Sequence, residues 1–125
     1  NTFIDKGCAS CHTGIALGGT MQPFELAAKY KFTSVGDFKG DAQGMVKTPT
    51  LRNITETAPY FHNGQIWSLN DAVKEMGSVQ LGITITDAEA SSIVTFLKTL
   101  KGVKPNISYP LLPESTIDTA KTEFN

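Results

Sequence analysis

The stretch Gly7-Cys-Ala-Ser-Cys-His-Thr-Gly14 holds both cysteines of the chain and one of its two histidines. Cys8, Cys11 and His12 are compatible with a metal site, a redox dithiol or an attachment point for a larger group. A disulfide between two cysteines this close would restrict the unfolded chain very little, because the loop that it closes is small. The two cysteines therefore indicate chemistry more than covalent bracing.

The spacing C-x-x-C-H is the attachment signature of c-type haem. Cys8 and Cys11 can form thioethers to the two vinyl groups on one porphyrin edge, and His12 can then ligate the iron. A thioredoxin-like dithiol would be followed by a helix, whereas TGIALGG is not a helix start. A zinc site needs four ligands, and only His62 remains as an obvious fourth. We therefore predict one covalent haem c, and with it a periplasmic or otherwise exported protein.

Length and composition fit a single small domain. The chain has 125 residues, of which 40% are hydrophobic and 18% charged, and its net charge is -1. This charge gives no basic surface for nucleic acid, and the apolar runs are too short to span a membrane. Because the chain begins at Asn1 and not at Met, we read it as a mature, trimmed or excised piece of a longer protein.

The predicted fold is mostly α: a cytochrome c-like domain with few helices and long loops around one haem. We expect a helix from an N-cap at Ser68 to a stop at Gly77, and a helix from a capping box at Thr86 to a stop at Gly102. The second of these should pack Ile93, Phe96, Leu97 and Leu100 near a short N-terminal helix at 1–7, which bears Phe3 and Ile4 and carries the haem motif.

The remaining segments carry turn signals and no clear period. Residues 13–46 should be irregular, with one helical turn near 24–29 and no convincing strand pair. We place the haem domain at 1–102. Residues 103–125 should form an extended, proline-containing tail packed on or near the domain, anchored by Tyr109, Leu111 and Leu112.

The second axial ligand decides between electron transfer and chemistry at an open iron site. The candidates are Met21, Met45, Met76 and His62. We favour Met76, because the capped helix gives it a rigid lead-in and Gly77 leaves room beside the ring. A methionine most often fills a gap in the core, and a lone histidine among aromatics is most often structural. His/Met ligation would raise the reduction potential and close the iron to peroxide.

Two further stretches carry a family resemblance: Pro49-Thr-Leu-Arg-Asn53 and Thr57-Ala-Pro-Tyr-Phe-His-Asn-Gly64, followed by Met76. In this order they resemble the C-terminal domain of bacterial di-haem cytochrome c peroxidases. Such enzymes reduce hydrogen peroxide with electrons from a small cytochrome c or a cupredoxin. The resemblance implies that the haem of His12 and Met76 is the high-potential one, feeding a peroxidatic haem in an N-terminal domain. The alternative is a free-standing mono-haem electron carrier, and a zinc-stabilised binding module is a third hypothesis.

The resemblance also implies roles for surrounding residues. Main-chain carbonyls of Thr57 and Pro59 would be ligands of a calcium ion shared with the N-terminal domain. Arg52 would bind a haem propionate, although a surface salt bridge is an equal alternative. His62 would surround the haem without ligating it, and Trp67 would be a packed aromatic. The full enzyme could form a homodimer.

Overall fold

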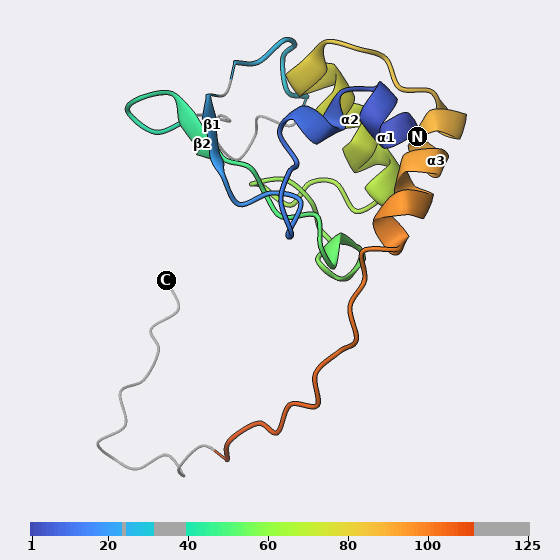
Figure 1. Cartoon of the computed structure of the whole chain (residues 1–125). Helices are drawn as coiled ribbons and strands as arrows, with labels where there is room; N and C mark the ends of the chain where they lie inside the picture. Colours follow the sequence, from blue (N-terminus) through green and yellow to red (C-terminus); the bar gives the residue numbers. More distant parts are fainter. Residues whose placement is uncertain (24, 32–39, 112–125) are drawn as a thin grey trace.

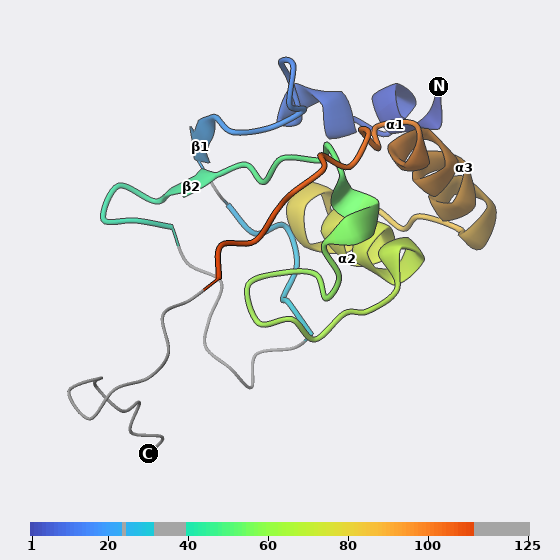
Figure 2. The ribbon, with the colours of Figure 1, turned by 90° about the horizontal axis from the view of Figure 1, so that it is seen from below.

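The computed structural model describes residues 1–23, 25–31 and 40–111 (Figure 1). In chain order the described elements are α1 (Thr2–Asp5), the 3-10 turn η1 (Cys8–Ser10), β1 (Met21–Pro23), β2 (Met45–Lys47), the 3-10 turn η2 (Ile54–Glu56), α2 (Leu69–Leu81) and α3 (Asp87–Lys98). Figure 2 shows the three helices gathered on one side and the small sheet on the other. The prediction of a mostly helical domain with long loops is confirmed.

The core lies where the two ends of the domain meet. α3 packs on both α1 and α2. The buried centre of the core consists of Phe3, Ile85, Ala90, Ile93 and Leu97. The ring of Phe96 lies 5.0 Å from that of Phe3. The predicted packing of the apolar side of α3 near the first helix is therefore confirmed, although Ile4, expected on that apolar side, is 60% exposed.

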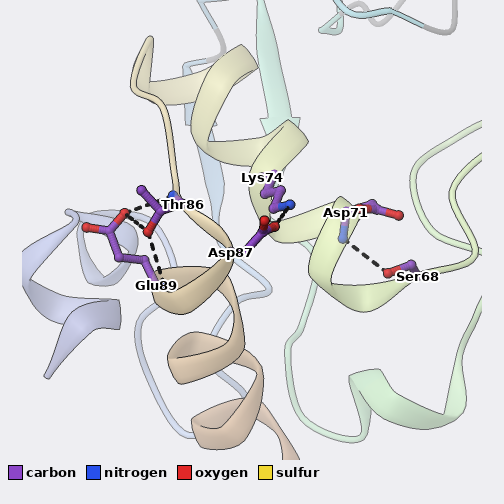
Figure 3. Close-up of polar contacts among 6 residues, drawn as sticks. All are labelled: Ser68, Asp71, Lys74, Thr86, Asp87 and Glu89. Atoms are coloured by element: carbon purple, nitrogen blue, oxygen red, sulfur yellow. Dashed lines mark hydrogen bonds and ion pairs between the residues drawn. The ribbon is translucent and has the colours of Figure 1, made fainter.

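Both long helices begin at the predicted caps (Figure 3). The Ser68 side chain accepts a hydrogen bond from the Asp71 amide. Thr86 and Glu89 form a complete capping box, with each side chain bonded to the other residue's backbone amide. An ion pair between Lys74 and Asp87 joins α2 to the start of α3. The caps at Ser68 and Thr86 satisfy amide groups that a helix N-terminus otherwise leaves without partners.

The predicted C-terminal ends of both helices are wrong. α2 passes through Gly77 and ends at Leu81, where Gly82 adopts the left-handed conformation typical of a C-cap. Gly77 serves packing instead, because a Cβ there would lie 2.5 Å from Cδ1 of the buried Ile85. α3 stops at Lys98, four residues before Gly102.

The described residues between the C-x-x-C-H motif and residue 46, which are 13–23, 25–31 and 40–46, are irregular as predicted, apart from a small sheet. β1 and β2 pair antiparallel, with Gln22 opposite Val46. The prediction of no strand pair is therefore wrong, because strands of three residues are too short to show an alternating pattern. Residues 25–29 form no helical turn, and Phe24 lies outside the described residues.

The described part of the tail, 103–111, contains no helix or strand and runs away from the helices (Figure 1). Tyr109 and Leu111, which we expected to anchor it, are 82% and 99% exposed. Leu112 and the residues after it lie outside the described part of the chain. The division into a domain at 1–102 and a tail remains a prediction.

Candidate haem site

The two cysteines lie in a short turn directly after α1. Gly7, in a left-handed conformation, ends the helical lead-in, and η1 then carries Cys8, with Cys11 as its C-cap. The motif therefore stands on a 3-10 turn and not on the N-terminal helix as predicted. Both thiols are free and half-buried. Burial raises the pKa of Cys8, which keeps this thiol protonated near neutral pH.

The imidazole of His12 is fixed through one of its two nitrogens. Nδ1 lies 3.1 Å from the carbonyl oxygen of Leu17. Since a carbonyl can only accept, Nδ1 carries the proton and Nε2 keeps its lone pair for a metal. Burial lowers the pKa of His12, and the nearby backbone carbonyls of Leu17 and Pro49 partly oppose this effect. The neutral form, which ligation requires, is therefore favoured.

The loop that holds the Leu17 carbonyl is docked onto the Pro49–Asn53 segment. Leu17 itself has a positive φ of 48°, which is unfavourable for a branched side chain. Next to it, Gly18 has a φ of 146°, and a Cβ at this position would overlap the Pro49 carbonyl. Only glycine allows the two backbones to approach this closely. The Pro49–Asn53 segment thus packs against residues 16–18, the part of the loop that contacts His12.

Arg52 contributes its side chain to this docking. Its Nε and Nη2 donate to the Ile15 carbonyl at 3.2 and 2.8 Å. Within the described residues no ion pair of Arg52 is found, so the salt-bridge alternative has no carboxylate partner there. Two of the five guanidinium N–H groups are used in this way, and a propionate contact remains a prediction.

The candidate methionines occupy different elements. Met76 is half-buried within α2, three residues after Val73. Residues three apart share a helix face, and Val73 packs against the same core as Cys8. Met21 lies on β1 and is 50% exposed, while Met45 lies on β2 opposite Pro23. Met76 is therefore the methionine whose helix face shares a core with a cysteine of the C-x-x-C-H motif.

A buried carboxylate beside Met76 escaped the sequence analysis. Glu75 is 2% exposed. Its Oε1 accepts from the backbone amide of Lys31 at 3.2 Å, and Oε2 lies 3.0 Å from Lys31 Nζ. Oε2 is a buried atom with no aligned hydrogen bond, so its contact with Nζ is ionic. The pair fastens the segment before residue 32 to α2.

The remaining predicted residues lie in the loop before α2. The His62 side chain is exposed and its ring lies 5.5 Å from that of Tyr30. Thr57 and Pro59 are exposed on either side of Ala58. Trp67 is 73% exposed, so the prediction of a packed aromatic is wrong. The described residues contain no group of three His, Cys, Asp or Glu side chains able to hold a metal, so the zinc hypothesis lacks a site there.

The arrangement fits a covalent haem: two free thiols at attachment spacing, and a histidine whose Nε2 is available. A family model described as cytochrome c matches residues 1–101. The chain belongs to the cytochrome c family. This membership implies a covalently bound haem c and confirms the predicted fold class.

The relatives of this cytochrome c domain are peroxidases. It is 41% identical to the cytochrome c551 peroxidase of Pseudomonas aeruginosa, over 95% of this chain and 37% of that protein. The cytochrome c551 peroxidase of Nitrosomonas europaea is 39% identical, over 98% of this chain and 39% of that protein. The cytochrome c peroxidase Ccp of Escherichia coli is 36% identical, over 81% of this chain and 24% of that protein.

The predicted resemblance to a cytochrome c peroxidase haem domain is thereby confirmed. The chain spans less than two fifths of the length of these relatives. Within the part of the chain that the structure describes, no helix is both long and apolar enough to cross a membrane.

Proposed function

We propose that this cytochrome c domain is the electron-transferring haem domain of a peroxidase. It would accept electrons from a small cytochrome c or a cupredoxin and pass them to a peroxidatic haem in an N-terminal domain, where hydrogen peroxide is reduced to water. The observation that carries the proposal is the His12 imidazole, whose Nδ1 is held by Leu17 while Nε2 stays available. The peroxidase relatives support the assignment to this kind of enzyme.

The chain's own residues would hold and insulate the cofactor. Bound haem c supplies one-electron redox chemistry. Cys8 and Cys11 would tether it, and His12 would contribute a neutral nitrogen ligand. Met76 would contribute a thioether ligand, which favours ferrous iron and raises the potential. With both positions occupied, peroxide has no access to this iron, so the isolated domain is expected to transfer electrons without turning over peroxide.

The ligand proposal is tested with haem-loaded protein and three single variants. Met76→Ala should abolish the long-wavelength absorption band of ferric haem with a sulfur ligand and lower the reduction potential. Met21→Ala and Met45→Ala are matched controls and should retain both properties. A Met76→Ala protein with an unchanged low-spin spectrum and potential would overturn the assignment of Met76. The free-standing carrier is distinguished by the full reading frame, where an upstream second C-x-x-C-H motif supports the peroxidase.

Further parts of the proposal concern the full enzyme. Thr57 and Pro59 would offer main-chain carbonyls to a calcium ion shared with the N-terminal domain, since carbonyl oxygens suit this hard cation. Arg52 would use its remaining donors on a haem propionate. The enzyme would work in the periplasm, where haem c is attached and thiols are otherwise oxidised, and it could form a homodimer. Calcium addition should raise the melting temperature of the two-domain protein and leave this domain unchanged.

A further inference from the structure

We propose that Thr50 and Arg52 are positioning residues for the axial histidine. They hold the loop 15–17 so that the Leu17 carbonyl stays on Nδ1 of His12, and through that hydrogen bond they tune the reduction potential of the iron. The inference rests on the proposed ligation by His12 and adds to it a pair of residues that touch neither the imidazole nor the iron.

Three consecutive carbonyls of this loop accept hydrogen bonds from the Thr50–Arg52 segment. The Arg52 side chain donates twice to Ile15, at 3.2 and 2.8 Å. The Thr50 hydroxyl donates to Ala16 at 2.6 Å. The backbone amide of Leu51 is shared between the carbonyls of Ala16 and Leu17, at 3.2 Å to each. The carbonyl that binds His12 is thus the last of a row of three fixed from the same side.

The loop needs this external support. Leu17 has a positive φ, a conformation that costs free energy and persists only where the surroundings impose it. The internal backbone bonds of the loop are two, from Leu17 to Gly14 and from Gly18 to Thr13. The second of these bonds holds the peptide unit that carries the Leu17 carbonyl, because the Gly18 amide and the Leu17 carbonyl share one plane. Neither bond reaches the carbonyls of Ile15 and Ala16. The donors of Thr50 and Arg52 therefore hold the two peptide units that precede the Leu17 carbonyl, and with them the loop that presents this carbonyl to His12.

The effect on the iron has a definite sign. A hydrogen bond from Nδ1 to a carbonyl makes Nε2 a stronger electron donor and orients the ring. A stronger donor stabilises ferric iron, so loosening this bond should make the potential more positive. Removing a nearby cation acts in the opposite direction, because a positive charge favours the reduced form. The sign of the shift in reduction potential therefore distinguishes the loss of loop positioning from the loss of a positive charge.

The test uses the haem-loaded full chain. Thr50→Val removes the hydroxyl without changing charge or size, and Thr50→Ser restores it; because Thr50 is exposed, neither change disturbs the core. In the ferrous protein, NMR measures how fast the Nδ1 proton of His12 exchanges with solvent. Thr50→Val should speed this exchange about tenfold, the factor that corresponds to losing one hydrogen bond of the loop, and should shift the potential positively. Thr50→Ser should match the unmodified protein.

Arg52→Gln is compared with Lys47→Gln, which removes an exposed cation three residues from Thr50 on β2. Arg52→Gln should speed the exchange, whereas Lys47→Gln should not. Arg52→Lys, which keeps a donor for Ile15, replaces Arg52→Gln if that variant fails to bind haem, and should then exchange at an intermediate rate.

Unchanged exchange and potential in Thr50→Val would overturn the inference, and so would an Arg52→Gln protein that behaves like Lys47→Gln. Failure of the proposed function gives a different result. In that case the unmodified protein itself would show no haem-ligated His12 resonance.

Discussion

Replacing Lys31 should destabilise this domain more than replacing its buried partner Glu75. The Glu75 carboxylate is 2% exposed, whereas the Lys31 ammonium, 3.0 Å away, is 69% exposed. Lys31→Met therefore leaves a buried charge without its counter-ion, while Glu75→Met leaves a cation that water already solvates. Burying an unpaired charge is the costlier of these two states.

The magnitude follows from the geometry of the pair. Breaking a fully buried ion pair by removing one partner costs about 3–5 kcal/mol. Solvent around Lys31 weakens the interaction, and the Lys31 amide still donates to Oε1 of Glu75 after the substitution. We therefore expect Lys31→Met to lower the free energy of unfolding by about 1–2 kcal/mol. The double variant with Glu75→Met should recover stability to within about 1 kcal/mol of the original, because apolar replacements of a buried pair are often neutral.

Urea denaturation of the haem-loaded protein, followed by far-ultraviolet circular dichroism, measures all four proteins of this cycle. Lys101→Met is the control, because Lys101 and Glu56 form a pair at 2.8 Å in which both side chains are about half exposed. Lys101→Met should change the midpoint of urea denaturation little. The reasoning is refuted if Lys31→Met is as stable as the original, or if the double variant is less stable than Lys31→Met alone.

Three further substitutions test other contacts. Thr86→Ala removes the capping box of α3 and should cost about 1 kcal/mol in urea denaturation, while Thr95→Ala, within the same helix, should not. A hydrogen bond from Lys6, with others from Thr86, lowers the pKa of Glu89 from 4.5 to about 2. Its stabilisation should thus be present above pH 4.5 and be lost as the pH falls toward 2, and acid titration of Glu89→Gln should lack this component. Gly18→Ala should lower the free energy of unfolding by about 2 kcal/mol or more, because its Cβ would overlap the Pro49 carbonyl. Gly19→Ala should lower it less, since a Cβ there would meet no atom within 4 Å.

Features encoded by neighbouring residues were predictable from the sequence. The haem motif, the cap at Ser68 and the capping box at Thr86 each depend on side chains within a few positions. The helix ends were not predictable in this way. Gly77 has the composition of a stop signal, but its absent side chain makes room for Ile85 of the following segment, and this contact is visible only in three dimensions.

The buried Glu75 shows the same limit. In the sequence it is one of the polar residues of a capped helix, and such residues are usually exposed. Its carboxylate is met by the backbone amide and the ammonium of Lys31, 44 residues earlier in the chain. The acceptor for His12 was missed for a related reason, because a backbone carbonyl leaves no signal in the sequence and Leu17 has no polar side chain.

The Pro49–Asn53 motif connects the loop 15–17, which contacts His12, to the residues that follow α3. At one end, Thr50 and Arg52 hold the carbonyls before and beside the His12 acceptor. At the other end, the backbone amide of Asn53 donates to the Leu100 carbonyl at 3.3 Å. The side-chain Oδ1 of Asn53 accepts from the backbone amide of Gly102 at 2.7 Å. One short segment therefore links the chain leaving α3 to the loop whose Leu17 carbonyl binds His12. α3 itself forms the core with Phe3, before the cysteines, so α3 and the residues directly after it support both sides of the C-x-x-C-H motif. In the proposed electron-transfer role this arrangement would be favourable, because a fixed ligand geometry needs little reorganisation between two redox states.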